Sequence, residues 1–330
     1  FADLDGVASS RVQIDTEVSP GSVLVRNADT RYEWTGEGSV SNTVITKDGT
    51  GALVLGSASI LGEGSSIIVA GGTLAFGYNT ALPTEGIAWG EGSCLGAANG
   101  ATVTIDLGAV TNPVFNFNPE TGSTISLTTP SNITLANNIA GAGTVAKTGT
   151  GTLTLTGANN GNLVVKEGTV QIGNGSALNW GAGGSVTLEN GTTLVLHGKG
   201  AHHTIGADLI LGLAASDAVF VKWYDATAAN DTDYQYNLTG NVVVNGQVDL
   251  TTDSHNYAKE AAFTGTLSGA GTITYSRGAG DGEYNSNGKM VICGDASGFT
   301  GTLALDSSNN YSTGLDLFSS VANATVSLTS

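Results

Sequence analysis

The chain of 330 residues contains 49 glycines and only 12% charged residues, and its 28 acidic residues against 11 basic ones give a net charge of −17. Apolar residues make up 40% of the sequence, which excludes a disordered acidic tail, and five prolines exclude a collagen triple helix. So acidic a chain is poorly suited to nucleic acid or anionic lipid, and we expect neither nucleic-acid binding nor membrane insertion by this segment.

The start of the chain, residues 1–6, lacks the basic and apolar regions of a signal peptide. We therefore interpret the sequence as a mature product or as a segment of a longer protein. No apolar run reaches the length of about 18 residues that a membrane-spanning helix requires.

Short runs of alternating apolar and polar residues recur along the whole chain. Each run has four to six residues bounded by Gly, Asn or Ser, a pattern typical of β-strands. One exception, Tyr257–Phe263, favours one or two helical turns. The predicted strands include residues 51–55, 73–76, 102–107, 124–127, 152–156, 192–196, 241–245, 271–275 and 301–305.

The strands also repeat as longer units. Ile45–Leu55 aligns with Val145–Leu155 at an offset of 100 residues, and both contain the phrase Lys-x-Gly-Thr-Gly. Each is followed by a Gly-Thr unit, at 71–77 and at 167–173, and looser relatives occur at 189–196, 267–274 and 297–305. A spacing of about 20 to 25 residues is typical of solenoid proteins.

This pattern predicts an all-β protein, a right-handed parallel β-helix formed by residues 1–330 as one continuous segment. At about 22 residues per turn, the chain corresponds to roughly 15 turns stacked about 4.8 Å apart. Residues 216–237 break the pattern, and we expect an irregular insertion or loop there. A β-sandwich is the alternative, but sandwiches rarely repeat such phrases.

The two cysteines, Cys94 and Cys293, are separated by about nine turns of such a helix, or more than about 40 Å along its axis. A disulfide requires Cα atoms within about 7 Å, so we expect no bond between them. We interpret both as small buried hydrophobic residues, with an intermolecular or metal-binding role as the alternative.

The phrase from Val145 to Asn160, with the following Gly168–Gly173, closely resembles the autotransporter-associated β-strand repeat, also called the passenger-associated transport repeat. Ile45–Gly77 is similar to a second copy, and Val18–Gly38 resembles the segment that often precedes such copies. The resemblance implies a type V secreted passenger, exported through the outer membrane and displayed on the bacterial surface or released. Such β-helices are often adhesive, self-associating or simple stalks. Several turns between residues 201 and 257 depart from the pattern.

The least repeat-like segment combines three aromatic residues with three acids. Aromatic rings stack on the C–H faces of sugars while carboxylates bind hydroxyl groups, so this set predicts a glycan-binding surface. The alternative is a solvated acidic loop that covers apolar turns. The residues are Trp223, Tyr224, Asp225, Asp231, Asp233 and Tyr234.

A β-helix hydrolase or lyase would require carboxylates converging on one face, together with a base. Candidates are Lys222, Asp225, Asp249 and Asp253, but no spacing forces them together, so we expect no catalytic site. His202 and His203 are adjacent and would point to opposite faces of a strand, which disfavours a shared metal. We expect no cofactor, with isolated calcium ions at acidic turns as the alternative.

These observations predict a non-enzymatic, extracellular structural or adhesive module of a bacterial surface or secreted protein. Its expected partners are copies of itself, associating end to end or laterally into fibres, or host and biofilm polysaccharides. The alternatives are a β-helix carbohydrate-active enzyme (glycoside hydrolase or lyase), a glycan-binding module and a passive stalk. The open ends of a solenoid favour self-association because each presents an unpaired strand.

Overall fold

The computed structural model describes residues 1–110, 113–175, 178, 180–198, 203–225, 234–253, 259–277, 288–306, 313–317 and 324–329. Contacts within these ranges define two compact units. Unit 1 comprises residues 1–128 and 137–146, and unit 2 comprises residues 129–136 and 147–330. All regular elements in the described ranges are β-strands, and none of these residues forms a helix that is long and apolar enough to cross a membrane.

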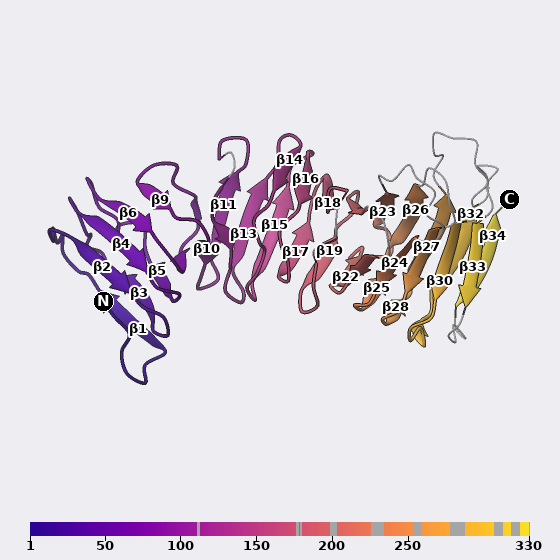
Figure 1. The fold of residues 1–330 in the computed structure, drawn as a ribbon, viewed down its shortest axis with the longest axis horizontal. Coiled ribbons are helices and arrows are strands. Elements are labelled where there is room, and N and C mark those ends of the chain that lie inside the picture. Colours follow the sequence, from indigo (N-terminus) through magenta and orange to yellow (C-terminus); the bar gives the residue numbers. More distant parts are fainter. Residues whose placement is uncertain are drawn as a thin grey trace. The chain divides into compact units, whose positions relative to one another are not determined.

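Unit 1 contains three parallel sheets, with strand orders β1-β3-β5-β7-β10-β12, β2-β4-β6-β9 and β8-β11-β13 (Figure 1). Strand β15, Thr144–Thr148, begins in unit 1 and ends in unit 2. The strands of unit 1 are β1 Ser9–Gln13, β2 Val23–Arg26, β3 Arg31–Thr35, β4 Val44–Asp48, β5 Ala52–Leu55, β6 Ser66–Val69, β7 Thr73–Phe76, β8 Thr80–Ala81, β9 Ile87–Trp89, β10 Cys94–Ala97, β11 Thr102–Asp106, β12 Asn116–Phe117 and β13 Thr124–Thr128.

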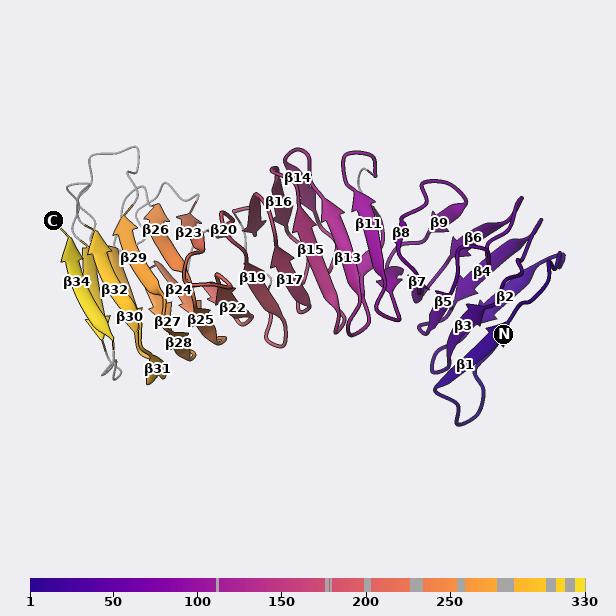
Figure 2. The same cartoon turned by 180° about the vertical axis from the view of Figure 1, so that it is seen from behind.

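Unit 2 also contains three parallel sheets, with orders β14-β16-β18-β20-β23-β26-β29-β32-β34, β17-β19-β22-β25-β28-β31 and β21-β24-β27-β30-β33 (Figure 2). Its strands are β14 Ile133–Leu135, β16 Thr152–Leu155, β17 Asn162–Val165, β18 Thr169–Ile172, β19 Ser185–Leu188, β20 Thr193–Gly198, β21 His203–Ile205, β22 Asp208–Leu211, β23 Ala218–Asp225, β24 Tyr234–Leu238, β25 Val242–Val244, β26 Gln247–Asp253, β27 Lys259–Phe263, β28 Leu267–Gly269, β29 Thr272–Arg277, β30 Gly288–Ile292, β31 Gly298–Phe299, β32 Thr302–Asp306, β33 Thr313–Leu317 and β34 Thr325–Thr329.

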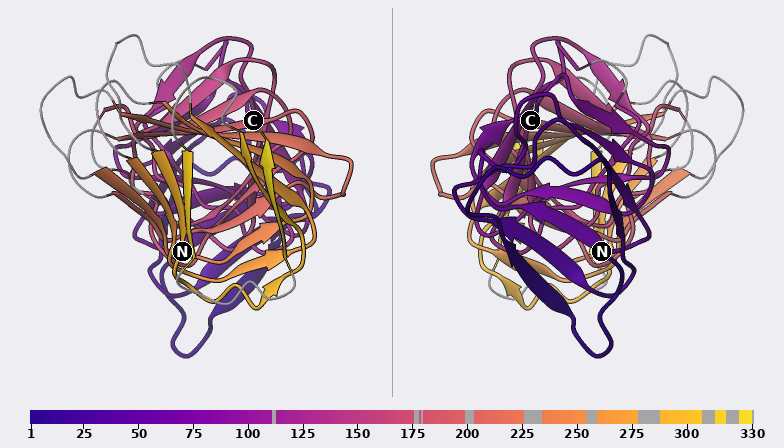
Figure 3. Two further views of the ribbon diagram at one scale, coloured as in Figure 1. Left: turned by 90° about the vertical axis from the view of Figure 1, so that its right-hand side faces the viewer. Right: turned by 90° about the vertical axis from the view of Figure 1, so that its left-hand side faces the viewer.

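Each strand pairs in register with the equivalent strand one coil later, where a coil is one turn of the solenoid. In unit 1, for example, Leu53, Leu74 and Leu95 form one column and are completely buried. Seen end-on, the orange and yellow strands of unit 2 lie on different sides of the coil (Figure 3). Because side chains alternate along a strand, apolar columns face inward and Thr, Ser and Asn face outward. The predicted parallel β-helix is confirmed.

Coil length varies along the chain, so the number of coils differs slightly from the expected 15. In unit 1 the repeat is close to the expected value, since Leu53 pairs with Leu74, 21 residues later. In unit 2, however, Tyr275 pairs with Leu305, 30 residues later. A parallel stack fixes only the paired strands, so the connecting loops lengthen without disturbing the core.

Two expected departures from the pattern are regular in the structure. Most of the segment 216–237 is strand, because β23 pairs with β20 and β26, and β24 pairs with β27; residues 226–233 lie outside the described ranges. Residues 259–263, where we expected helical turns, form β27 between β24 and β30. Parallel pairing on both sides therefore outweighs the local helix propensity of Lys, Glu and Ala. Cys94 and Cys293 are both free thiols.

Candidate functional site

The repeated phrase Lys-x-Gly-Thr-Gly places a lysine inside each unit. In unit 1, Lys47 occupies the inward column between Val25 and Val69, where it is fully buried. Its ammonium donates to the main-chain oxygens of Asp48 at 2.9 Å, Gly49 at 3.0 Å and Gly71 at 3.3 Å. Three hydrogen bonds match the three donors of an ammonium group, so Lys47 fastens its own corner to the next coil.

The equivalent lysine of unit 2 makes the same kind of contacts. Lys147 is fully buried, and its ammonium donates to the main-chain oxygens of Gly149 at 2.6 Å, Glu167 at 2.8 Å and Thr148 at 3.5 Å. We call each such set of three carbonyl groups around a lysine a lysine cradle. Each cradle joins two consecutive coils at one corner of the solenoid.

Glycines of the motif make room for the cradle. Gly49 and Gly149 have φ angles of 79° and 80°, and Gly72 and Gly168 have φ angles of 69° and 72°. A Cβ atom on Gly72 would also clash with the main-chain oxygen of Gly49 and would lie 2.8 Å from Nζ of Lys47. The motif therefore combines a cation, two left-handed corners and a close coil contact that only glycine permits.

An acidic side chain completes each cradle from a different position. In unit 1 the carboxylate of Asp48 accepts from the main-chain N–H of Gly49 at 2.8 Å. In unit 2 the carboxylate of Glu167, from the following coil, accepts from the N–H of Gly149 at 3.0 Å. At the equivalent corner, the glycine N–H is thus bound in unit 1 by the adjacent residue Asp48 and in unit 2 by Glu167 of the next coil.

Burial lowers the pKa of both lysines from 10.5 to about 8. The charges of Asp48 and Asp3 act against this shift at Lys47, and the charge of Glu167 acts against it at Lys147. The carbonyl oxygens therefore compensate only part of the cost of removing each ammonium from water. Both ammonium groups stabilise the interior of the fold, and burial keeps them out of reach of substrates.

The structure places Trp223, one of the three aromatic residues of the predicted glycan surface, in the core. Trp223 faces the core with no exposed surface, and its ring stacks on Tyr236 at a centroid distance of 5.4 Å and an interplanar angle of 29°. The ring of His203 lies 5.2 Å from Tyr236 on β24. Trp223 therefore stabilises the core of unit 2 and is not available to stack on a sugar, and His203 is a buried strand residue.

Three other members of the predicted surface have defined positions in the main chain. Tyr224 pairs in register with His197 and Asp253, Asp225 pairs with Gly198, and Tyr234 pairs with Lys259. Asp231 and Asp233 lie outside the described residues, as does His202. The register separates β23 from β24, which belong to different sheets, so the six residues are not one strand surface.

The candidate catalytic residues are brought together only in part. Lys222 of β23 and Asp249 of β26 lie on adjacent strands, two positions out of register, since Lys222 pairs with Thr251. Desolvation raises the pKa of Asp249, and Asp306 of β32 raises it further, whereas Thr251 and Lys222 lower it. A lysine and two carboxylates thus share one outer face, a placement that the spacing did not predict. For Asp225 and Asp253 the structure gives only the strand position.

A second charged cluster lies on the outer face of unit 1. Arg31 donates to both carboxylate oxygens of Glu120, at 2.6 Å and 3.2 Å, and to Glu33 at 3.2 Å. Asn99 donates to the other oxygen of Glu33 at 2.9 Å. The loops after β10 and β12 therefore cross the outer face of β5 and β7, which explains why Val54 is fully buried there. A cavity of about 320 Å³ remains beside Glu120.

Within the described part of the chain, no group of three or more His, Cys, Asp or Glu side chains is placed to hold a metal ion. A scan against protein-family models, a search of curated proteins and a search of solved structures each found no match.

Proposed function

We propose that the chain is a structural module of a bacterial surface or secreted protein, a passenger-type β-solenoid that acts by self-association and by displaying its loops. The observation that carries this proposal is the pair of lysine cradles. They give a physical role to the motif by which the sequence resembles autotransporter passengers, since its lysine and glycines join one coil to the next. Export through the outer membrane to an extracellular location belongs to the same proposal.

An apolar outer face in unit 1 supports lateral self-association. On the sheet β2-β4-β6-β9, Leu24 and Ile68 lie in one row with Thr46 between them, and Val44 lies two positions away on the same face. Leu24, Ile68 and Val44 have exposed fractions of 45%, 43% and 44%, respectively. Burying large apolar side chains that are grouped on one face of a sheet against a second apolar surface removes them from water and lowers the free energy.

The test compares the purified 330-residue chain with the double variant Leu24→Ser/Ile68→Ser by sedimentation velocity and negative-stain electron microscopy. We expect oligomers or fibres for the wild type and a strong shift toward monomer for the variant. Leu213→Ser is the matched control, because Leu213 is 58% exposed but lies in unit 2. If the double variant associates as strongly as the wild type, this face is not the association surface.

A carbohydrate-active enzyme is the second candidate, favoured by one observation. Asp249 has a raised pKa and shares its face with Lys222 and Asp306. A carboxyl group that holds its proton longer than usual is suited to general acid catalysis. Assays for reducing-end release or unsaturated products from bacterial and host polysaccharides test this role. Turnover that disappears in Asp249→Asn but persists in the exposed control Asp29→Asn would establish the enzyme and replace the structural proposal.

A further inference from the structure

The first four residues form an extended strap along the free edge of β2. The nitrogen of Phe1 donates to the main-chain oxygen of Leu24 at 2.7 Å, and the N–H of Arg26 donates to the oxygen of Phe1 at 2.7 Å. This alternation is the pattern of a parallel strand pair. We call residues 1–4 the strap and the surface beneath it the strap groove, formed by β2, the turn 27–30 and the ring faces of Tyr32 and Trp34.

The polar contacts of the strap are centred on Asp3. Its carboxylate accepts from the main-chain N–H groups of Ala28 at 2.9 Å, Asp29 at 2.8 Å and Thr30 at 2.8 Å. These successive N–H groups form a concave anion site, and they lower the pKa of Asp3. Tyr32 also donates to the main-chain oxygen of Ala2 at 2.6 Å. The groove thus recognises an extended backbone and a carboxylate at the third position.

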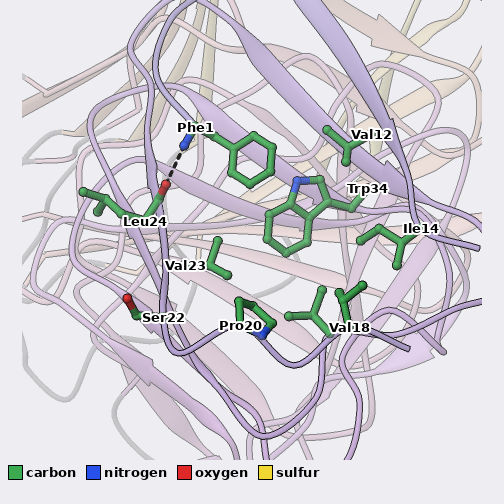
Figure 4. A pocket seen from close by; sticks show the side chains of 10 residues that line it. Phe1, Val12, Ile14, Val18, Pro20, Ser22, Val23, Leu24 and Trp34 are labelled. Atoms are coloured by element: carbon green, nitrogen blue, oxygen red, sulfur yellow. Dashed lines mark hydrogen bonds between the residues drawn. The ribbon is translucent and has the colours of Figure 1, made fainter. Parts of the chain in front are cut away.

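The apolar contacts of the strap are incomplete. The ring of Phe1 lies 5.4 Å from that of Tyr32 and 5.5 Å from that of Trp34, yet Phe1 remains 49% exposed. Figure 4 shows Phe1 beside Trp34 in the lining of a cavity. A cavity of about 440 Å³ lies next to these rings, and the buried Nε1 of Trp34 has no hydrogen-bond partner among the described residues. The other residues that line this cavity are mostly apolar: Val12, Ile14, Val18, Pro20, Ser22, Val23, Leu24 and Val40.

A tight turn connects the strap to β1. The N–H of Val7 donates to the oxygen of Leu4 at 3.0 Å, and Gly6 has a φ angle of 70°. A Cβ atom on Gly6 would meet none of the described residues within 4 Å, and residues 5–8 are exposed. The turn therefore depends on the left-handed conformation of Gly6 and on a hydrogen bond from Oγ1 of Thr30 to the main-chain oxygen of Val7 at 2.8 Å.

We propose that the strap groove also binds the strap of a second copy of this chain, so that two molecules exchange residues 1–4. The occupant follows from the contacts above, because the strap matches the groove at its backbone, its carboxylate and its aromatic ring. Exchange repeats all of these contacts between molecules and loses only the turn with its hydrogen bond from Thr30 to Val7. Swapping of this kind is a low-cost route to dimers. The inference rests on the proposed function, since it specifies one mode of self-association.

The experiment changes the turn at residues 5–8, which is the hinge of the exchange, without changing the strap groove. In Gly6→Val the first side-chain carbon has open space around it, but a β-branched residue strongly disfavours a φ of 70° and favours an extended hinge. We expect the dissociation constant of the dimer, measured by sedimentation equilibrium, to fall about tenfold or more. Adding Asp3→Ala to Gly6→Val should abolish this gain in association, whereas adding Asp5→Ala, an exposed acid of the same turn, should not.

A peptide measurement keeps the test independent of variant folding. Excess Phe-Ala-Asp-Leu peptide should dissociate the Gly6→Val dimer by occupying the groove, and Phe-Ala-Ala-Leu should not. A monomeric Gly6→Val chain with an unchanged circular dichroism spectrum would overturn the exchange. A dimer that persists with Asp3→Ala and resists the peptide would also overturn it, while leaving self-association through another face in place.

Discussion

The ammonium of Lys147 donates to the main-chain oxygen of Glu167 at 2.8 Å, across a sequence separation of 20 residues. This hydrogen bond joins two consecutive coils through a side chain that is completely buried. Lys47 repeats the arrangement in unit 1 through its contact with Gly71. A solenoid is stabilised mainly by contacts between neighbouring coils. A buried donor that links one coil to the next therefore contributes directly to the stability of the fold.

Replacing Lys147 by methionine should destabilise the chain by about 1–3 kcal/mol at pH 7, because a side chain of similar shape leaves buried carbonyl groups without a donor. Urea unfolding followed by circular dichroism measures the change. Lys166→Met is the matched control, since Lys166 lies nearby but is exposed, and it should change stability by less than about 0.5 kcal/mol. Equal effects of the two substitutions would contradict the role of the cradle.

The contribution of the cradles should increase with pH. Each lysine has a pKa of about 8 in the folded chain against an ordinary value of 10.5, so between these values the unfolded chain binds more protons. The free energy of unfolding therefore rises with pH across this window, by about 1–3 kcal/mol per lysine. The difference between the wild type and Lys147→Met, measured at pH 7 and at pH 10.5, isolates this term. A difference that stays constant or shrinks would refute the lowered pKa.

Gly72 should tolerate a methyl group far less well than Gly92. Both have positive φ angles, 69° and 77°, so alanine costs about 1 kcal/mol at either position. At Gly72 the new Cβ would also meet Gly49 and Lys47, whereas at Gly92 it would meet none of the described residues within 4 Å. We expect Gly72→Ala to lower the thermal midpoint by several degrees more than Gly92→Ala. Similar midpoints would mean that the cradle adapts to the extra atom.

Trp223→Ala should act on stability rather than on glycan binding. Loss of a fully buried tryptophan costs about 3–5 kcal/mol, whereas Phe220→Ala on the same strand removes a ring that is 39% exposed and should cost much less. Chemical denaturation measures both variants. If a glycan array detects a ligand, binding to folded Trp223→Ala should equal that of the wild type. Selective loss of binding would place a sugar on this ring after all.

The fold could be predicted from the sequence because its causes are local. Alternation along each strand and the recurrence of the Lys-x-Gly-Thr-Gly phrase are both visible without coordinates. The same alternation, applied to β23, would have placed Trp223 in the core: Val219, Val221 and Trp223 are buried, while Phe220 and Lys222 face outward. Grouping Trp223 with its acidic neighbours by composition is wrong for this residue, because its ring is buried.

Other features depend on which coil follows which and could not be predicted. The role of Lys147 requires knowing that Glu167 lies on the next coil, and Asp249 meets Lys222 only because β26 follows β23 in the sheet. Loop length also varies, so residue spacing does not fix these neighbours. The ion pair between Arg31 and Glu120, 89 residues apart, illustrates the same limit because a loop carries Glu120 across several strands.

Sedimentation velocity of the wild-type chain over a concentration series tests the proposed function most directly. We predict a sedimentation coefficient that increases with concentration, and a much smaller increase for Leu24→Ser/Ile68→Ser. A wild-type chain that sediments as a monomer at every concentration would contradict self-association.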